Sequence, residues 1–231
     1  MISITVSFLR LAGSLVLVAS QQSPVAVVEE VSGSPAGIQF MNYVEPGQII
    51  KLGPQDSIII GYFRSCWRET IAAGTVTIGA EESTVQGGKV ERAKVACQPS
   101  KAQLSGELLN SSGGNLFRQG PHGGPPARSD HPQFTLYGLS PIIEVRPGDT
   151  LIIERIDGPR ERHEIVLSDN QLVQGAFLDL ARAGVVLAAG GLYRARAGTQ
   201  EAIFKIDPAA RSGDTPIVGR LLRLPAGEPI R

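Results

Sequence analysis

Aromatic residues, cysteine and histidine are all scarce in this chain of 231 residues. Aromatics make up 5% of it, with one tryptophan, two cysteines and three histidines. An excess of one charge is also missing, because 22 basic residues balance 22 acidic ones. A neutral chain lacks the long-range field that gathers nucleic acid, so nucleic acid is excluded as an expected partner. After residue 20 no apolar run approaches the roughly 18 residues that cross a bilayer, so we expect no stable membrane span after processing.

Glycine and proline, in contrast, are abundant at 27 and 16 residues. β-Branched and leucine groups recur over a few positions, as at residues 49–52, 58–60 and 76–78, and a Gly, Pro or Ser cluster ends each group. No apolar stripe with helical spacing is sustained over ten or more positions. Short strands joined by tight turns are therefore predicted, and the fold class is all-β.

The first 20 residues have the features of an export signal. Arg10 precedes an apolar run at residues 11–19, and Ser20 stands where signal peptidase accepts a small residue. The alternative is a first β-strand, because residues 2–6 alternate apolar and polar side chains. The export reading predicts a periplasmic or secreted protein.

The predicted export determines how the two cysteines are interpreted. Two cysteines in an oxidising compartment usually pair, so we expect a disulfide between Cys66 and Cys97. Closing a loop of this length stabilises a fold by about 3 to 4 kcal/mol. The alternative is two unrelated buried thiols. A redox centre is disfavoured because the C-x-x-C spacing is missing.

Composition divides the chain into segments. Of residues 105–133, 14 are Gly, Pro or Ser, and such a stretch buries too little apolar surface to offset its ordering entropy. We therefore predict two small β-sandwich or β-roll domains joined by a Gly/Pro-rich linker. The predicted segments are a signal peptide (1–20), a first β domain with the disulfide (21–104), a flexible linker (105–133), a β-sandwich domain (134–225) and a tail (226–231).

Some local elements follow from turn and cap signals. Residues 38–44 and 217–224 read as strands, and Gly87 and Gly88 provide the positive φ of a hairpin turn. Residues 178–183 are expected to form one or two helical turns. Asp207 followed by Pro208 is a helix-start pair, so residues 207–211 are expected to form a single helical turn.

A stretch of the second domain resembles the front half of a cupredoxin. It covers residues 141–167, PIIEVRPGDTLIIERIDGPRERHEIVL, and His163 stands where a copper ligand falls in that family. A blue-copper site also needs a cysteine thiolate and a second histidine, and none follows His163. The resemblance implies a Greek-key sandwich, and no metal or other cofactor is expected. His122 and His131 lie in the predicted flexible linker with no Cys, Asp or Glu at ligand spacing except Asp130, so they are also set aside as metal ligands.

The first domain resembles the FecR-like periplasmic domain family. That family has a leading strand, a glycine turn before an I-x-L-G strand, and a later Gly-Thr-Val segment. The matching residues are Val31, Gly33, Gly47, Ile49, Ile50, Leu52, Gly53, Ser57 and the stretch GTVTIG at 74–79. The usual Asp-Gly-Ser turn is missing, and the cysteine pair is an addition. The resemblance implies a periplasmic β domain that binds other proteins, without the transmembrane relay of the signalling members.

No catalytic residue is predicted. There is no G-x-S-x-G motif, and the neighbouring carboxylates of Glu29–Glu30 or of Glu81–Glu82 point to opposite faces of a strand. The candidate ligand-binding residues are Trp67, Arg155, Arg194 and Arg196. For Trp67 the alternative is a core position covering the disulfide, and for the arginines it is a solvated strand face.

These observations predict an exported, non-enzymatic binding or scaffolding protein of the bacterial cell envelope. Its expected partners are envelope proteins or glycans. The alternative is a glycan-binding accessory protein or an enzyme that acts on envelope glycans.

Overall fold

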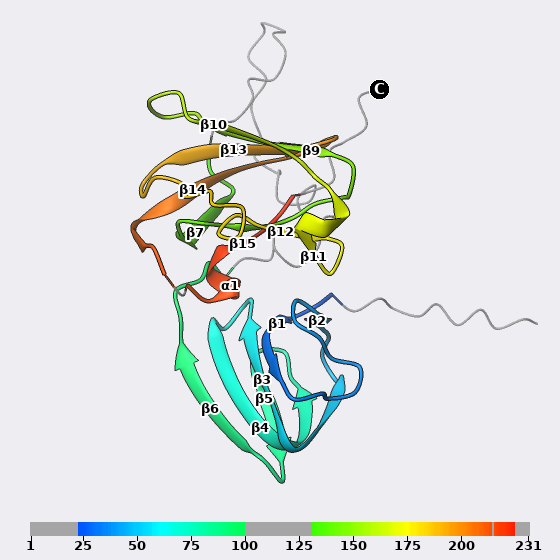
Figure 1. Cartoon of the computed structure of the whole chain (residues 1–231). Coiled ribbons are helices and arrows are strands. Elements are labelled where there is room, and N and C mark those ends of the chain that lie inside the picture. Colours follow the sequence, from blue (N-terminus) through cyan, green and yellow to red (C-terminus); the bar gives the residue numbers. More distant parts are fainter. Residues whose placement is uncertain (1–22, 100–130, 214, 225–231) are drawn as a thin grey trace, which may run out of the picture.

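The protein is nearly all β, as predicted. A computed structural model describes residues 23–99, 131–213 and 215–224, which form three sheets and one short helix (Figure 1). We call residues 23–99 the N-terminal half and residues 131–224, without residue 214, the C-terminal half. The predicted signal peptide, tail and most of the linker lie outside the described residues, and the division into two domains stays a prediction. No helix within the described ranges is long and apolar enough to cross a membrane.

The N-terminal half is one six-stranded sheet that curls around its own core. Its strands are β1 (Ala26–Ser32), β2 (Tyr43–Val44), β3 (Ile49–Tyr62), β4 (Trp67–Ile78), β5 (Ser83–Gln86) and β6 (Lys89–Lys94). They follow the order β2-β1-β3-β4-β5, and β6 also pairs with β4. Alternate side chains such as Ile58, Ile60 and Tyr62 point into the core, as the period of two requires.

Two expectations for this half were wrong. Only Tyr43 and Val44 of residues 38–44 form a strand, because the preceding residues turn back and Met41 donates its N–H to the Val28 carbonyl. Gly87 has the positive φ predicted for it, +69°, but it makes no hairpin. Instead β5 and β6 both pair with β4 and form one interrupted edge strand. Gly88 lies against the backbone of Ala73, where no Cβ would fit.

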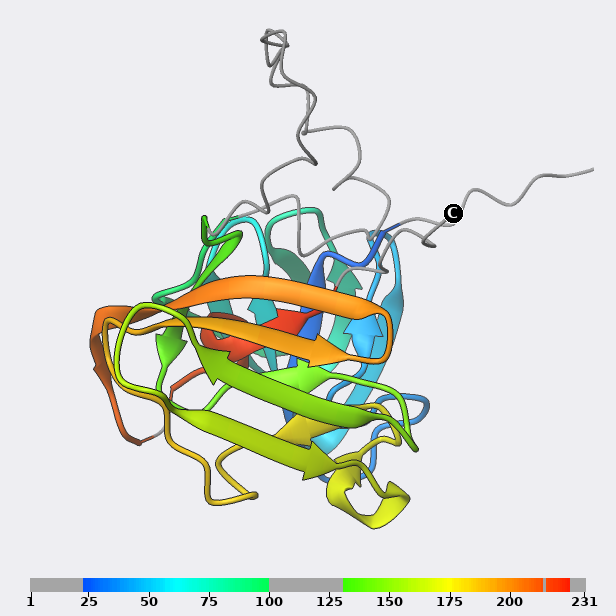
Figure 2. The same ribbon diagram turned by 90° about the horizontal axis from the view of Figure 1, so that it is seen from above.

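The C-terminal half is a sandwich of two sheets. The five-stranded sheet has the order β10-β9-β13-β14-β7, and Figure 2 shows β10, β9, β13 and β14 side by side. Its strands are β7 (Phe134–Gly138), β9 (Thr150–Arg155), β10 (Arg162–Val166), β13 (Leu192–Ala197) and β14 (Gln200–Arg211). The four-stranded sheet contains β8 (Ile142–Glu144), β11 (Leu172–Val173), β12 (Phe177–Asp179) and β15 (Leu221–Arg223). Residues of both sheets, among them Leu136, Ile153 and Leu222, share one core.

Three local predictions for this half need correction. Residues 207–211 continue β14 instead of forming a helical turn. The strand pairs with β7 and bulges in this region, and the Asp207 side chain accepts a hydrogen bond from the Ala209 N–H within the bulge. Of the predicted helical turns at 178–183, residues 178–179 belong instead to β12, and the residues that follow form a turn. The expected strand at 217–224 begins with one helical turn, α1 (Ile217–Arg220), before β15. A 3₁₀ turn, η2 (Asp169–Gln171), precedes β11.

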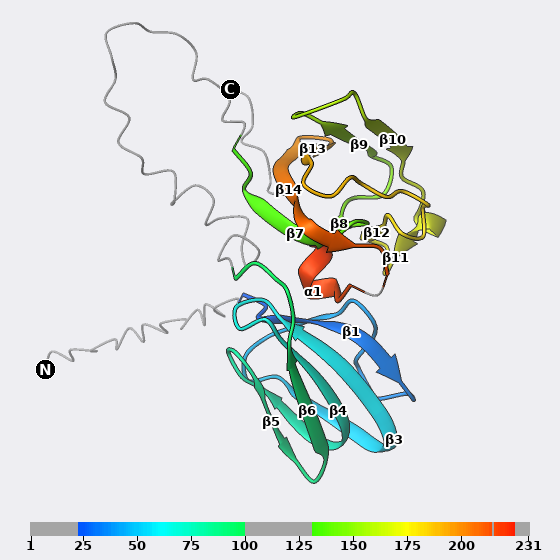
Figure 3. The same ribbon diagram turned by 90° about the vertical axis from the view of Figure 1, so that its left-hand side faces the viewer.

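The two halves meet through a third apolar cluster, and α1 lies between them (Figure 3). Val27, Met41 and Phe63 from the N-terminal half pack there with Phe177 and Val218 from the C-terminal half. Next to this cluster the Tyr43 hydroxyl donates to Glu144 at 2.9 Å, and Arg223 donates to the same carboxylate at 2.7 Å. Burial, followed by the nearby Glu144 charge, raises the pKa of Tyr43.

The predicted disulfide is present in this junction. Cys66 and Cys97 are bonded, with their Cα atoms 5.6 Å apart, and both belong to the cluster shared by the halves. The bond ties the segment after β6 to the turn between β3 and β4 within the N-terminal half, and this segment also contacts the C-terminal half. There Gly219 of α1 lies against the Ala96 carbonyl, and the Thr135 amide donates to the Gln98 side chain.

Two buried tyrosines make a testable prediction about pH. Burial is the main cause that raises the pKa of Tyr62 to about 12 and that of Tyr193 to about 12, from the usual 10.0. The folded state therefore holds these protons more tightly, so their contribution to stability is complete below pH 10 and is lost as the pH rises through about 12. Tyrosinate absorbance should show both residues ionising near pH 12, and the variants Tyr62→Phe and Tyr193→Phe should each reduce that absorbance change by one tyrosine. Ionisation of both residues at the usual pH in the folded protein would contradict the assignment.

Candidate functional site

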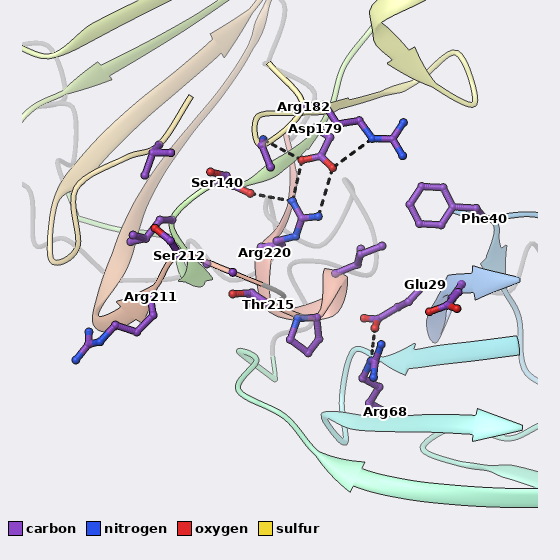
Figure 4. Close-up of a pocket in the computed structure, with 18 residues that line it drawn as sticks. Glu29, Phe40, Arg68, Ser140, Asp179, Arg182, Arg211, Ser212, Thr215 and Arg220 are labelled. Carbon is purple, nitrogen blue, oxygen red and sulfur yellow. Dashed lines mark hydrogen bonds and ion pairs between the residues drawn. The ribbon is translucent and has the colours of Figure 1, made fainter. Parts of the chain in front are cut away.

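A groove of about 660 Å³ runs between the two halves beside α1 (Figure 4). We call it the inter-half groove. Glu29, Glu30, Phe40 and Arg68 line it from the N-terminal half. The C-terminal half contributes the turn after β12, the segment between β14 and α1, and α1 itself, with Asp179, Arg182, Val186, Arg211 and Arg220 among the lining residues.

Glu29 is a buried carboxylate at the floor of the junction. The register of β1 against β3 shifts between Val28 and Glu30, and this bulge turns the Glu29 side chain inward until only 2% of it is exposed. It passes over Gly61, where an added Cβ would lie 2.5 Å from the Glu29 Oε1 atom. Glycine at this position therefore leaves the space that the carboxylate occupies.

The Glu29 carboxylate joins the two halves. Its Oε2 accepts from Arg68 Nε at 2.8 Å within the N-terminal half. Its Oε1 accepts from the backbone N–H of Val218 in α1, also at 2.8 Å. The charge is thus paired and hydrogen-bonded, which is the condition under which a carboxylate can be buried.

Asp179 forms the second carboxylate centre, on the C-terminal side of the groove. Arg220 binds it with two nitrogens, at 2.9 and 3.4 Å, and donates as well to the Ser140 carbonyl at 2.9 Å. The Ala181 N–H donates to the Asp179 Oδ1 atom at 3.0 Å. The Arg182 Nε atom lies 3.9 Å from Oδ2, and 68% of the Arg182 side chain is exposed.

Phe40 faces Arg182 across one end of the groove (Figure 4). The ring is half-buried and belongs to the loop between β1 and β2. The next residue, Met41, has φ of +67° and is buried in the junction cluster, and the Gln39 N–H donates to the Asn42 side chain at 2.8 Å. A non-glycine residue in this conformation is unfavourable by itself, so the surrounding packing must fix the loop and with it the position of Phe40.

A smaller hollow of about 370 Å³ shares the Asp179 and Arg182 wall with the groove. We call it the side cavity. Asn170, Gln171 and both residues of β11 line it. Among the described strands β11 is the edge strand of the four-stranded sheet, so this cavity lies beside an edge strand.

Trp67, one of the residues predicted from sequence, does not reach the groove. It is half-buried against the core of the N-terminal half, whereas the cysteine beside it belongs to the junction cluster. Lys94 lies over its ring, with Nζ 4.1 Å from the ring centroid. The Trp67 side chain is therefore packed against the core and makes a cation–π contact, both within the N-terminal half.

The three predicted arginines lie on the five-stranded sheet and are not brought together. Arg194 and Arg196 follow the outward alternation of β13, at 3.5 Å from Glu201 and 3.0 Å from Glu154 respectively. Arg155 ends β9 and donates to Asp157 at 2.9 Å, which lowers the pKa of that carboxyl. None of the three lines the groove or the side cavity.

The histidines form no metal site in the described part of the chain. His163 contacts Glu161 at 3.2 Å, and Tyr193 donates to the same carboxylate at 2.8 Å. His131 lies at the start of the C-terminal half, and His122 lies outside the described residues. No three His, Cys, Asp or Glu side chains in the described ranges converge as metal ligands do.

The groove residues were missed because sequence offers no signal for them. Glu29 and Asp179 lie in different halves, 150 positions apart, and neither belongs to a motif. The one local hint is Gly61 inside an otherwise β-branched strand, since such a glycine often marks a close approach by another group.

Comparison with known proteins does not extend this picture. No family model matches the chain, and no curated protein or solved structure matches it either.

Proposed function

We propose that this protein is an exported, non-enzymatic binding protein of the bacterial cell envelope, which holds a segment of another envelope protein in the inter-half groove. The observation that carries the proposal is the groove itself. Its volume of about 660 Å³ lies in the range of roughly 300–1,000 Å³ typical of ligand sites, which often form between packed units.

The state of the two carboxylates favours binding over catalysis. A general base needs an oxygen within reach of the proton it removes. Glu29 already accepts from Arg68 and Val218, and Asp179 from Arg220 and Ala181. Carboxylates that are already hydrogen-bonded in this way suit a rigid binding surface.

Three features support an extracytoplasmic location. The bonded Cys66–Cys97 pair suits an oxidising compartment, because thiols are kept reduced in the cytosol. The export signal predicted at residues 1–20 and the FecR-like pattern of the N-terminal half agree with that location.

Photo-crosslinking in the envelope tests the proposal. A photoreactive residue at Val186, which is 55% exposed in the groove, should form a distinct protein adduct. The matched control is Val166 on β10, which is 70% exposed and lines neither hollow. No adduct at position 186, or the same adduct at both positions, would reject the groove as the site. An adduct that resists protease but is released by glycan hydrolases would establish the glycan-binding alternative instead.

A further inference from the structure

We infer that the segment held in the groove is an extended peptide with acidic side chains, and that Arg182 recognises its charge. The inference rests on the proposed function and specifies the ligand of the same site. It depends on three observations: a surplus positive charge, the position of that charge between two hollows, and the strand edge that borders one of them.

The surplus charge arises at Asp179. Arg220 and the Ala181 N–H already supply three hydrogen-bond donors to this carboxylate. A carboxylate has room for about four. Arg182 is consequently a second cation beside one anion, and at 3.9 Å it is held only loosely. The wall carries a net positive charge, and its exposed guanidinium can donate to a further carboxylate.

The position of Arg182 indicates the shape of the ligand. The residue lines both the inter-half groove and the side cavity, so a bound chain passing from one to the other crosses its guanidinium. Phe40 and Val186 provide apolar surface on the groove side. A ligand that fills both hollows must therefore be elongated and carry its negative charge near the middle.

The strand edge favours a peptide over a glycan. Both residues of β11 line the side cavity, together with Leu178 and Asp179 of β12, and among the described strands β11 pairs with β12 alone. An extended peptide can align with such an edge, whereas a sugar chain has no main-chain amides to match it.

Selection from a phage-displayed random-peptide library on the oxidised full-length protein tests this inference. We expect selected peptides to be enriched in Asp and Glu, and their affinity to fall as salt increases. Arg182→Glu should weaken binding by about tenfold or more. The matched control Arg160→Glu, in the exposed loop between β9 and β10, should change affinity less than about twofold. An unchanged urea midpoint verifies that each variant is folded.

The other outcomes separate the inference from the proposed function. Peptides without acidic enrichment that lose binding when Val186→Trp fills the groove would overturn the acidic ligand and leave the groove as a protein-binding site. Acidic peptides that bind the Arg182→Glu variant equally well would remove Arg182 from recognition. If no peptide is selected and an array of acidic glycans binds instead, both the peptide ligand and the proposed protein partner are wrong.

Discussion

Replacing Cys66 and Cys97 together by serine should lower the free energy of unfolding by about 3 to 4 kcal/mol, the largest loss we expect from any change to the fold. The bond spans 31 positions, and its removal restores chain entropy to the unfolded state. Both residues are also buried in the junction cluster, at 8% and 7% exposure, so the serine hydroxyls would lie in an apolar environment.

Urea unfolding of the oxidised protein, of the reduced protein and of the double variant measures this effect. The reduced protein should lose nearly as much stability as the variant, whereas the variant itself should not respond to reductant. A double variant within about 0.5 kcal/mol of the oxidised protein would show that the bond contributes little to the folded state.

Glu29→Ala should cost about 2 to 4 kcal/mol, because it leaves the Arg68 guanidinium and the Val218 N–H without their shared acceptor. This cost is toward the lower end of what is usual for breaking a buried ion pair, because 34% of the Arg68 side chain remains exposed to solvent. Glu29→Gln keeps an acceptor for Val218 but loses the charge, so its cost should be intermediate.

Glu30→Ala is the matched control for this experiment. The neighbouring residue is exposed and makes no ion pair within the described part of the chain, so its replacement should change stability by less than about 0.5 kcal/mol. Equal urea midpoints for Glu29→Ala and Glu30→Ala would mean that Glu29 does not hold α1 to the N-terminal half.

The fold class was predictable where one physical signal dominates. On β3 and β4 the alternation of side chains identifies strands because one face must be buried. The cysteine pair was predictable for a different reason, since two cysteines in a chain with a predicted export signal have few other uses.

Local signals failed where the tertiary partner decides the conformation. Asp207 followed by Pro208 reads as a helix start, yet the same carboxylate serves a bulge once β7 offers a parallel partner. Gly87 and Gly88 read as a hairpin, but both flanking strands pair with β4, and Gly88 lies against the backbone of Ala73. In both cases the neighbour lies far away in sequence.

The groove could not be predicted because it exists only between the halves. The alternation of side chains along a strand did place Glu29 and Glu30 on opposite faces. Whether Glu29 faces solvent or the other half, however, depends on the bulge in β1 and on the position of α1. The arginines of β9 and β13 were more conspicuous in the sequence, and the structure pairs them with acidic neighbours on the five-stranded sheet.

Hydrogen exchange of the oxidised full-length protein, with and without the partner crosslinked at position 186, tests the central claim most directly. We predict slower exchange at the Ala181 and Val218 amides, whose acceptors Asp179 and Glu29 border the groove. Protection confined to β13 around Arg194 and Arg196, with no change at Ala181 or Val218, would place the partner on the five-stranded sheet and contradict the groove as the binding site.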